Sequence, residues 1–529
     1  MTVISSGVRA ARTPAATANW LASPLFFWAV LALYLALHLA FRLWETPNLG
    51  KNDVQEALAA YGWAWGYHPR NPPLHTWLLM ASYSVFGPST LAHAALKYVL
   101  LGAMYAFAYL SGRRVLGTNA LAATAAISLT LLTPFAWTVH TALTHTLLLA
   151  TIIMATLWAA IRLTTHGRWL DYAAFGIAIG LGFLAKYSFP LFLAPLLAAM
   201  LCQRAFRPVI LNARMLVALS AALLVFLPHG LWMAGARFDF VTFLANKQHS
   251  ETVHPYIVDV GLGLGNLLLG AVSFLAPLLL LGAIFLRGAP RAAWASLSPW
   301  ARTLCLLPVF GLGLFVFDVV AFRATQFEER YFLCALLLAP LALFAAFDWQ
   351  SVRQANVKLA AFATSVLVAA LIVLAGLSGR ALIGNASCGR CLNEMAISQL
   401  VENIRGDSGF RSGTVIADHY NVAGNLALAF PHDRVIAANY LVTLPLNDAA
   451  GQCLLVWNAR NAGDALPLSL ATYLSDRDVE LPVGGHPTYV DAPLLRSENR
   501  MDRFAYWLLP TADGNCDPIA PRPSALLSP

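Results

Sequence analysis

Long runs of apolar residues, separated by short polar segments, make up most of the chain. A helix needs about 20 apolar residues to cross roughly 30 Å of hydrocarbon, and many of these runs are close to that length. The pattern therefore predicts a mainly α-helical, multi-pass membrane bundle. About eleven spans are expected, near residues 24–41, 89–111, 119–137, 142–163, 172–186, 187–204, 214–233, 257–286, 303–322, 331–347 and 358–377.

The pattern changes after about residue 379. Strand-like runs (TVIAD, RVIAAN, CLLVWN, FAYWLLP) alternate there with helix-like ones (NVAGNLALAF, PLSLATYLSD), which is typical of an α/β fold. We therefore divide the chain into a transmembrane domain over 1–378 and a small soluble α/β domain over 379–529. The Pro-rich end of that domain is expected to be extended or disordered.

Composition agrees with this division, since 59% of the 529 residues are hydrophobic and only 11% are charged. Lys and Arg gather in alternate short loops, as in Arg9 and Arg12 or Arg113 and Arg114, and cytoplasmic loops carry such an excess. The N-terminus is therefore expected in the cytoplasm and the C-terminal domain outside. Topology explains the net charge of +8, so no nucleic-acid partner is needed.

Four of the seven cysteines fall in the C-terminal domain: Cys388, Cys391, Cys453 and Cys516. An even number of cysteines in an outside compartment favours disulfides. The spacing of Cys388 and Cys391 also fits half of a metal site or a redox pair, and sequence alone leaves these alternatives open.

The first outside loop, residues 42–88, contains NDVQEALAAYGWAWGYHPRNPPLHTW. Its aromatic residues prefer the headgroup layer, so we expect amphipathic helices lying along the membrane surface. Asp53 and Glu56 are three residues apart and share one face of such a helix. Their spacing alone fits an ordinary helix start equally well, because acids are favoured in the first turn.

A longer set of motifs distinguishes a functional pair of acids from an ordinary helix start. It comprises Asp53, Glu56, Gly66, Tyr67, Pro72, Pro73, Leu74 and Trp77, followed by LTHT at 143–146, AKYSFPLF from Ala185, PHGLW from Pro228 and FEERYFLCALLLAP at 327–340. This order of motifs resembles the C-type membrane glycosyltransferases that use polyprenyl-phosphate sugars. Bacterial relatives of the protein mannosyltransferases and the lipid A aminoarabinose transferases belong to that group.

The resemblance implies an enzyme of the bacterial inner membrane that works at its outer face. The sugar would pass from a polyprenyl phosphate, with inversion, to a hydroxyl of lipid A or lipopolysaccharide, another glycolipid, a glycan or a protein. Asp53 would be the general base, supported by Glu56. Candidates for binding the donor phosphate are Lys186, Arg330, Arg70 and Lys247, and candidates for lining the substrate cavity are Tyr67, His145, Tyr187, His229 and Glu328.

Several alternatives stay open at this level. A transporter or flippase, or a receptor of lipid-linked sugars, would also need a lipid groove and cationic residues. Lys186 could simply snorkel at a helix end, and Arg330 could pair with a neighbouring acid. The spacing indicates no cofactor, although Asp53 or Glu56 could hold a divalent metal ion with histidines from other loops. The resemblance implies an acid at the position of Ala142 and, for some relatives, a lysine at that of Asn71, and this chain has neither. These departures leave both the metal and the sugar open.

Overall fold

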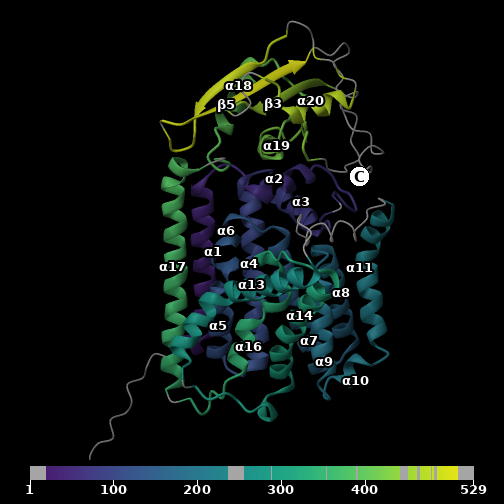
Figure 1. Ribbon diagram of the computed structural model, residues 1–529, viewed down its shortest axis with the longest axis vertical. Coiled ribbons are helices and arrows are strands. Elements are labelled where there is room, and N and C mark those ends of the chain that lie inside the picture. Colours follow the sequence, from purple (N-terminus) through teal and green to yellow (C-terminus); the bar gives the residue numbers. More distant parts are fainter. Residues whose placement is uncertain are drawn as a thin grey trace, which may run out of the picture.

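A helical bundle lies below a small α/β domain, and short helices fill the space between them (Figure 1). The computed structural model describes most of the chain. Lys247 and Cys516 are outside the described ranges, which are 20–68, 70–235, 255–287, 289–352, 354–388, 391–440, 451–460, 465–477, 479, 481, 485–497 and 499–509. The mainly helical fold with a C-terminal sheet is as predicted.

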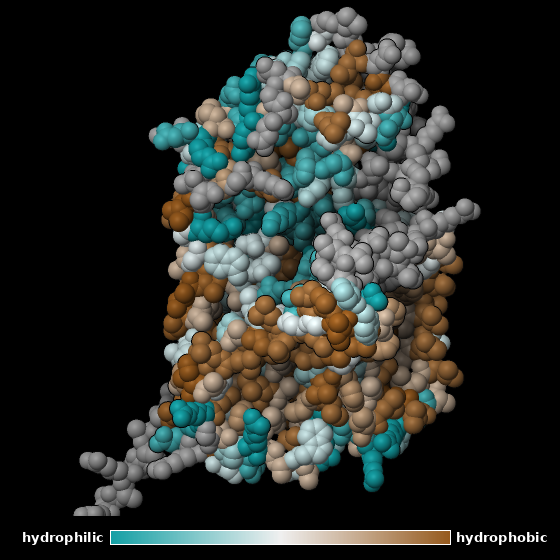
Figure 2. Space-filling view, viewed as in Figure 1, coloured by the Kyte–Doolittle hydropathy of each residue, from teal (hydrophilic) through white to brown (hydrophobic). Residues whose placement is uncertain are grey.

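Seven helices of the described part are long and apolar enough to cross a membrane, or eight if a bent pair counts as one span. The seven are α1 (Pro24–Glu45), α4 (Thr90–Leu116), α7 (His145–His166), α11 (Met215–Gly235), α13 (Tyr256–Phe285), α14 (Pro299–Phe322) and α17 (Ala355–Ser387). Large apolar side chains such as Leu268, Leu280 and Phe317 stay exposed on these helices. On the face shown in Figure 2, apolar side chains form a band across the lower part of the molecule, with polar residues above and below it.

The number of full spans is smaller than the predicted eleven. Helices α8 (Trp169–Ala185) and α9 (Pro190–Leu201) coincide with predicted spans but have 17 and 12 residues. The segment near 331–347 is divided into α15 (Leu333–Leu336) and α16 (Ala339–Ala345). Pro340 lies at the start of α16, and a proline there removes a helical hydrogen bond. Hydropathy alone does not register such breaks.

The predicted span 119–137 is bent sharply. Helix α5 (Asn119–Ile127) continues through a short 3-10 turn to Leu131, and the chain then enters a π-helical turn at Pro134 and α6 (Val139–Thr141). The two halves meet at 80°. Proline and π-turns are common causes of kinks. The bend places His140 beside Tyr34 of α1.

Residues 42–88, the first outside loop, form two short helices and their connections. That these helices lie along the membrane surface stays a prediction. Helix α2 (Lys51–Ala59) follows Gly50, and α3 (Leu74–Phe86) follows the Pro72-Pro73 turn. Val54, Ala57 and Leu58 of α2 are buried in the core of the C-terminal domain. Gly424 packs so closely on α2 that a β-carbon would lie 2.4 Å from the Val54 carbonyl oxygen. The loop is therefore covered by that domain.

The C-terminal domain is built on a five-stranded sheet of order β2-β1-β3-β5-β4. Strands β1, β2 and β3 are parallel, and β5 is antiparallel to β3 and β4. The bounds are β1 (Gly413–Ala417), β2 (Arg434–Ala437), β3 (Gln452–Asn458), β4 (Thr488–Pro493), β5 (Met501–Leu509), α18 (Ile397–Asp407), α19 (Tyr420–Ala429) and α20 (Leu468–Ser475). Sequence predicted all of these except α18 and β4. Strand β4 is at the edge of the sheet and contains Asp491 and Pro493, which weaken its sequence signal.

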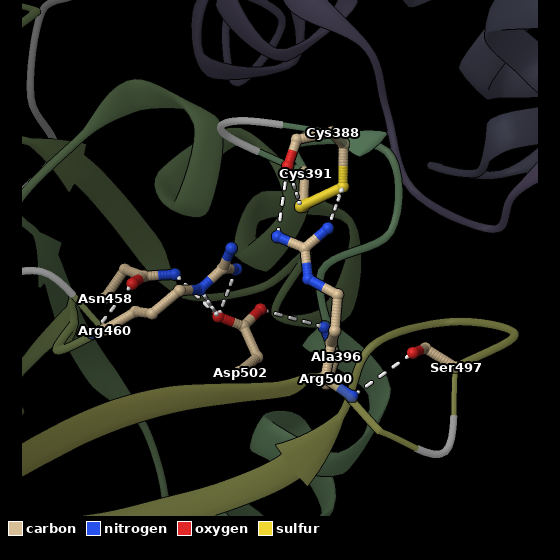
Figure 3. The surroundings of a disulfide bond; sticks show 8 residues. All are labelled: Cys388, Cys391, Ala396, Asn458, Arg460, Ser497, Arg500 and Asp502. Carbon is tan, nitrogen blue, oxygen red and sulfur yellow. Dashed lines mark hydrogen bonds and ion pairs between the residues drawn. A yellow bond between two sulfur atoms is a disulfide. The ribbon is translucent and has the colours of Figure 1, made fainter. Parts of the chain in front are cut away.

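A disulfide joins Cys388 and Cys391 where the chain leaves α17 for the C-terminal domain, and Cys453 is disulfide-bonded as well. The Arg500 guanidinium donates to the Cys388 carbonyl oxygen, at 3.1 Å (Figure 3). Two bonds reach from the next residues to the segment before α2: Thr46 Oγ1 donates to the Asn393 carbonyl oxygen and Asn48 Nδ2 to that of Met395, at 2.5 and 2.8 Å. This linker therefore joins the sheet domain to the entry of α2.

Candidate active site

Helix α2 directs two carboxylates into the protein. Asp53 and Glu56 lie one turn apart, and each residue is only 6% exposed. A buried carboxylate is costly unless it is paired or hydrogen-bonded. The spacing also allowed an ordinary helix start with solvated acids. The structure shows buried acids instead.

Asp53 faces two cationic or potentially cationic groups of α4. Its Oδ2 lies 3.4 Å from Lys97 Nζ, and its Oδ1 lies 3.9 Å from His93 Nδ1. Burial alone would raise the pKa of the Asp53 carboxyl, but Lys97 and His93 outweigh burial and hold that pKa below its ordinary value. Asp53 is consequently ionised at neutral pH. A small cavity lies beside it, lined also by His75, His93 and Lys97.

Glu56 accepts hydrogen bonds from three buried side chains. Its Oε2 accepts hydrogen bonds from His75 Nδ1 at 3.0 Å and from Thr76 Oγ1 at 2.9 Å, and its Oε1 accepts one from His145 Nε2 at 2.7 Å. We call Glu56, His75, Thr76 and His145 the Glu56 cluster. Three segments far apart in sequence meet in it, because His75 and Thr76 come from α3 and His145 begins α7. These bonds hold the pKa of the Glu56 carboxyl well below its ordinary value, against the opposing effect of burial.

Lys186 lies beside this cluster. Its Nζ donates to Thr146 Oγ1 at 2.7 Å, next to His145 in the chain. Lys186 is half-buried and follows the last residue of α8, and its ammonium group lies near His145. Tyr187 hydrogen-bonds His229 Nε2 at 3.0 Å. His229 in turn donates through Nδ1 to the Trp65 carbonyl oxygen at 2.8 Å, which ties this pair to the first outside loop.

Other predicted site residues are placed less centrally. Arg330 pairs with Glu328 at 2.5 Å, and their side chains are 38% and 54% exposed, which matches the surface pair considered from sequence. Tyr67 is buried, and its hydroxyl accepts the Ala64 amide at 3.1 Å. Arg70 is exposed at the turn before α3. Roles for these four residues in binding stay predictions.

Sequence reasoning missed Lys97, His93 and His75. Lys97 interrupts an apolar span, and a lone charge at membrane depth is expensive and usually functional, so one signal was available. His93 stands four residues earlier on the same face of α4. His75 lies inside the PPLHTW motif, but nothing in the sequence indicates that it meets His145.

The Glu56 cluster could hold a metal ion. The donor atoms of Glu56, His75 and His145 all lie within 4.8 Å of one another, and two histidines with one glutamate are a common ligand set of catalytic zinc. His145 Nδ1 is buried without a hydrogen-bond partner among the described residues, so a lone pair is available there. The set therefore fits a divalent ion, which would place positive charge close to the reacting groups.

We expect protein purified without chelator to carry about one divalent ion per chain. His145→Ala and His75→Ala should each remove most of it, while His432→Ala, at an exposed position, should not. Elemental analysis measures this directly, and the melting temperature before and after chelation gives a second readout. Background metal in the wild type would show that the cluster is held by hydrogen bonds alone.

The multi-pass bundle, the buried acids of the first outside loop and the α/β domain above them fit the resemblance to the C-type membrane glycosyltransferases. The chain is a membrane glycosyltransferase. A family model described as dolichyl-phosphate-mannose-protein mannosyltransferase matches residues 70–232. The match begins after Asp53 and Glu56 and includes Lys97, His145 and Lys186.

Two lipopolysaccharide core galacturonosyltransferases of Rhizobium johnstonii are similar over most of their length. RgtB is 27% identical over 456 residues, which are 85% of this chain and 90% of RgtB. RgtA is 27% identical over 442 residues, which are 82% of this chain and 87% of RgtA. Among solved structures, ArnT from Cupriavidus metallidurans bound to undecaprenyl phosphate has the same fold, with a TM-score of 0.56, 13% identity and coverage of 93% and 98% of the two chains. These relatives favour a transferase over a transporter or receptor.

Proposed function

We propose that the chain transfers a uronic acid, of the galacturonic acid type, from a polyprenyl phosphate to a hydroxyl of the lipopolysaccharide core. The observation that carries this proposal is the similarity to RgtB and RgtA over more than four fifths of the chain. The candidate site supports it. Lys97 lies beside the buried Asp53 carboxylate, and Lys186 bonds Thr146 next to His145 of the Glu56 cluster. Two cationic groups suit a donor that is anionic at both its phosphate and its sugar.

The reaction needs an acceptor oxygen, an activated sugar and a place for one proton. The acceptor hydroxyl oxygen attacks the anomeric carbon, the bond from that carbon to the phosphate oxygen breaks, and the polyprenyl phosphate leaves with the electron pair. Asp53 accepts a hydrogen bond from the hydroxyl and takes its proton as the new bond forms. Attack opposite the leaving group inverts the anomeric configuration.

Asp53 is a weak base because Lys97 pairs with it. The reaction does not need a strong base, since its leaving group is a good one. The phosphate leaves as a stabilised anion, so the proton on the attacking oxygen becomes acidic as the bond to phosphate breaks. A carboxylate that stays ionised at neutral pH is then always ready to accept it. Lys186 would bind the departing phosphate as a point charge, and orientation within the outer part of the bundle would keep both substrates aligned.

Cells provide the test of the substrate assignment. The lipopolysaccharide core of a strain that encodes this chain should lose one uronic-acid residue when the gene is deleted, and the wild-type gene should restore it. Mass spectrometry of the isolated core, with and without mild acid treatment, measures the change. An unaltered core, with the loss appearing in another glycolipid or in protein, would refute the assigned acceptor.

Substitution of Lys186 should weaken binding of the donor. Lys186→Gln keeps a polar side chain but removes the charge, and a charge-assisted hydrogen bond to phosphate is strong enough for a rise of about tenfold or more in the donor KM. The matched control is Lys51→Gln at the exposed start of α2, which should leave the donor KM unchanged. Equal KM values for Lys186→Gln and the wild type would remove Lys186 from the phosphate site.

A further inference from the structure

The parallel part of the C-terminal sheet has a point at which its strand order reverses. From β1 the chain passes through α19 to β2 on one side, while β3 lies on the other side of β1. In sheets of this kind ligands bind outside the carboxyl ends of the strands, at the reversal. A ligand of this sheet would therefore bind at the carboxyl ends of β1, β2 and β3.

Asp418 follows β1 at this edge. Its backbone amide donates to the Val456 carbonyl oxygen of β3 at 3.0 Å, so the residue lies at the reversal itself. Backbone amides of Asn458 and His419 bond its carboxyl group, and burial nevertheless raises the pKa of Asp418 to about 7. Its Oδ1 atom is buried and has no hydrogen-bond partner among the described residues. Such an atom is costly to leave unpaired, so it points to a ligand.

Aromatic residues continue the same edge toward the membrane part. Tyr440 follows β2, and its ring stacks on that of His68 from the first outside loop, with centroids 5.1 Å apart and an interplanar angle of 6°. Tyr420, at the start of α19, lies 5.8 Å from Tyr440. Arg70 is two residues beyond His68, and its amide donates to His68 Nδ1 at 3.0 Å.

This edge is held above the carboxylates of α2. Helix α19, which starts at Tyr420, packs directly on α2 at Val54. The Leu49 amide, just before α2, also donates to Asn425 Oδ1 of α19 at 2.7 Å. Both contacts fix the sheet edge relative to Asp53 and Glu56. A group bound at the edge would consequently stand at the outer side of the transfer site, where an acceptor must arrive.

We propose that Asp418, Tyr420, Tyr440, His68 and Arg70 form a subsite for the acceptor, and that it takes an anionic sugar residue of the acceptor glycan. The Asp418 carboxyl would bond sugar hydroxyls, and the aromatic rings would offer apolar faces to the ring carbons. The exposed Arg70 guanidinium would pair with a carboxylate or phosphate on the glycan. The inference rests on the proposed function, because it takes the acceptor to be a charged glycolipid core.

The test compares acceptor and donor kinetics with the full-length protein. Asp418→Asn, His68→Ala and Arg70→Gln should each raise the acceptor KM by about tenfold, the loss expected for one buried or charged hydrogen-bonding group. In Asp418→Asn and His68→Ala the donor KM should not change. Asp491→Asn is the matched control, since Asp491 is 58% exposed on the edge strand β4. The acceptor KM is also measured with acceptors that lack either phosphate or acidic sugars. The group whose removal abolishes the effect of Arg70→Gln is the group that Arg70 binds.

His68 and Arg70 belong to the membrane part, so their variants test the subsite even if Asp418→Asn fails to fold. An unchanged acceptor KM in both of these variants, with transfer intact, would overturn the inference and leave the proposed function standing. A rise in the donor KM in place of the acceptor KM would assign Arg70 to the donor and also overturn it. Absence of transfer by the wild type to any glycolipid would count against the proposed function itself.

Discussion

Asp53→Asn should lower the rate of sugar transfer by about a thousandfold, the typical contribution of a positioned general base. The amide has nearly the same shape, so it still fills the space beside Lys97 and His93, but it cannot take the proton of the acceptor hydroxyl. The measurement is the initial rate with a labelled donor at saturating acceptor. The variant should still bind the donor. The amount of labelled donor that the purified protein holds at equilibrium measures this binding.

Asp407→Asn is the control for this substitution, because Asp407 is exposed at the end of α18, in the domain above α2. It should transfer at the wild-type rate. A rate for Asp53→Asn within a few-fold of the wild type would exclude Asp53 as the base. The Glu56 cluster would then be the next place to look, beginning with Glu56→Gln.

Lys97→Met should destabilise the protein more than any substitution of an exposed residue. It leaves Asp53 as a buried charge without its main partner, and breaking such a pair costs about 3–5 kcal/mol. The double variant Asp53→Asn with Lys97→Met removes both charges and should recover most of the lost stability while remaining inactive. Apparent melting temperatures in detergent measure the stability, and transfer rates measure the activity.

The same pair predicts the sign of the pH dependence. Because the pKa of Asp53 is held below its ordinary value in the folded protein, the pair stabilises the fold at neutral pH, and this contribution is lost as the pH falls toward the folded pKa. The double variant should therefore lose less stability on acidification than the wild type.

If the single and double variants melt at the same temperature at neutral pH, Lys97 and Asp53 are not energetically coupled.

The features that sequence predicted well are local ones. The long apolar runs located most of the spans, and the short apolar runs located β1, β2, β3 and β5. Asp53 and Glu56 could be singled out because the order of motifs around them resembles the C-type membrane glycosyltransferases. Their spacing alone fitted an ordinary helix start equally well. Burial of both acids could not be foreseen, since it depends on side chains of α3, α4 and α7 that lie 19, 44 and 89 positions further along the chain.

The features that sequence missed depend on long-range contacts or on breaks inside apolar runs. His75 and His145 meet at Glu56 although 70 residues separate them, and neither spacing nor composition encodes that contact. Pro134 bends one predicted span by 80° without changing its hydropathy. For Arg330, sequence left open a pairing with a neighbouring acid, and the structure shows that pair with Glu328.

The most direct test of the account is transfer by the purified protein in a defined mixture. The donors are polyprenyl phosphates carrying a uronic acid, a neutral hexose or aminoarabinose, and the acceptor is lipopolysaccharide core that lacks terminal uronic acids. We expect transfer from the uronic-acid donor alone, and NMR of the product should show the inverted anomeric configuration. Retained configuration, or transfer only from a nucleotide sugar added without polyprenyl phosphate, would contradict it.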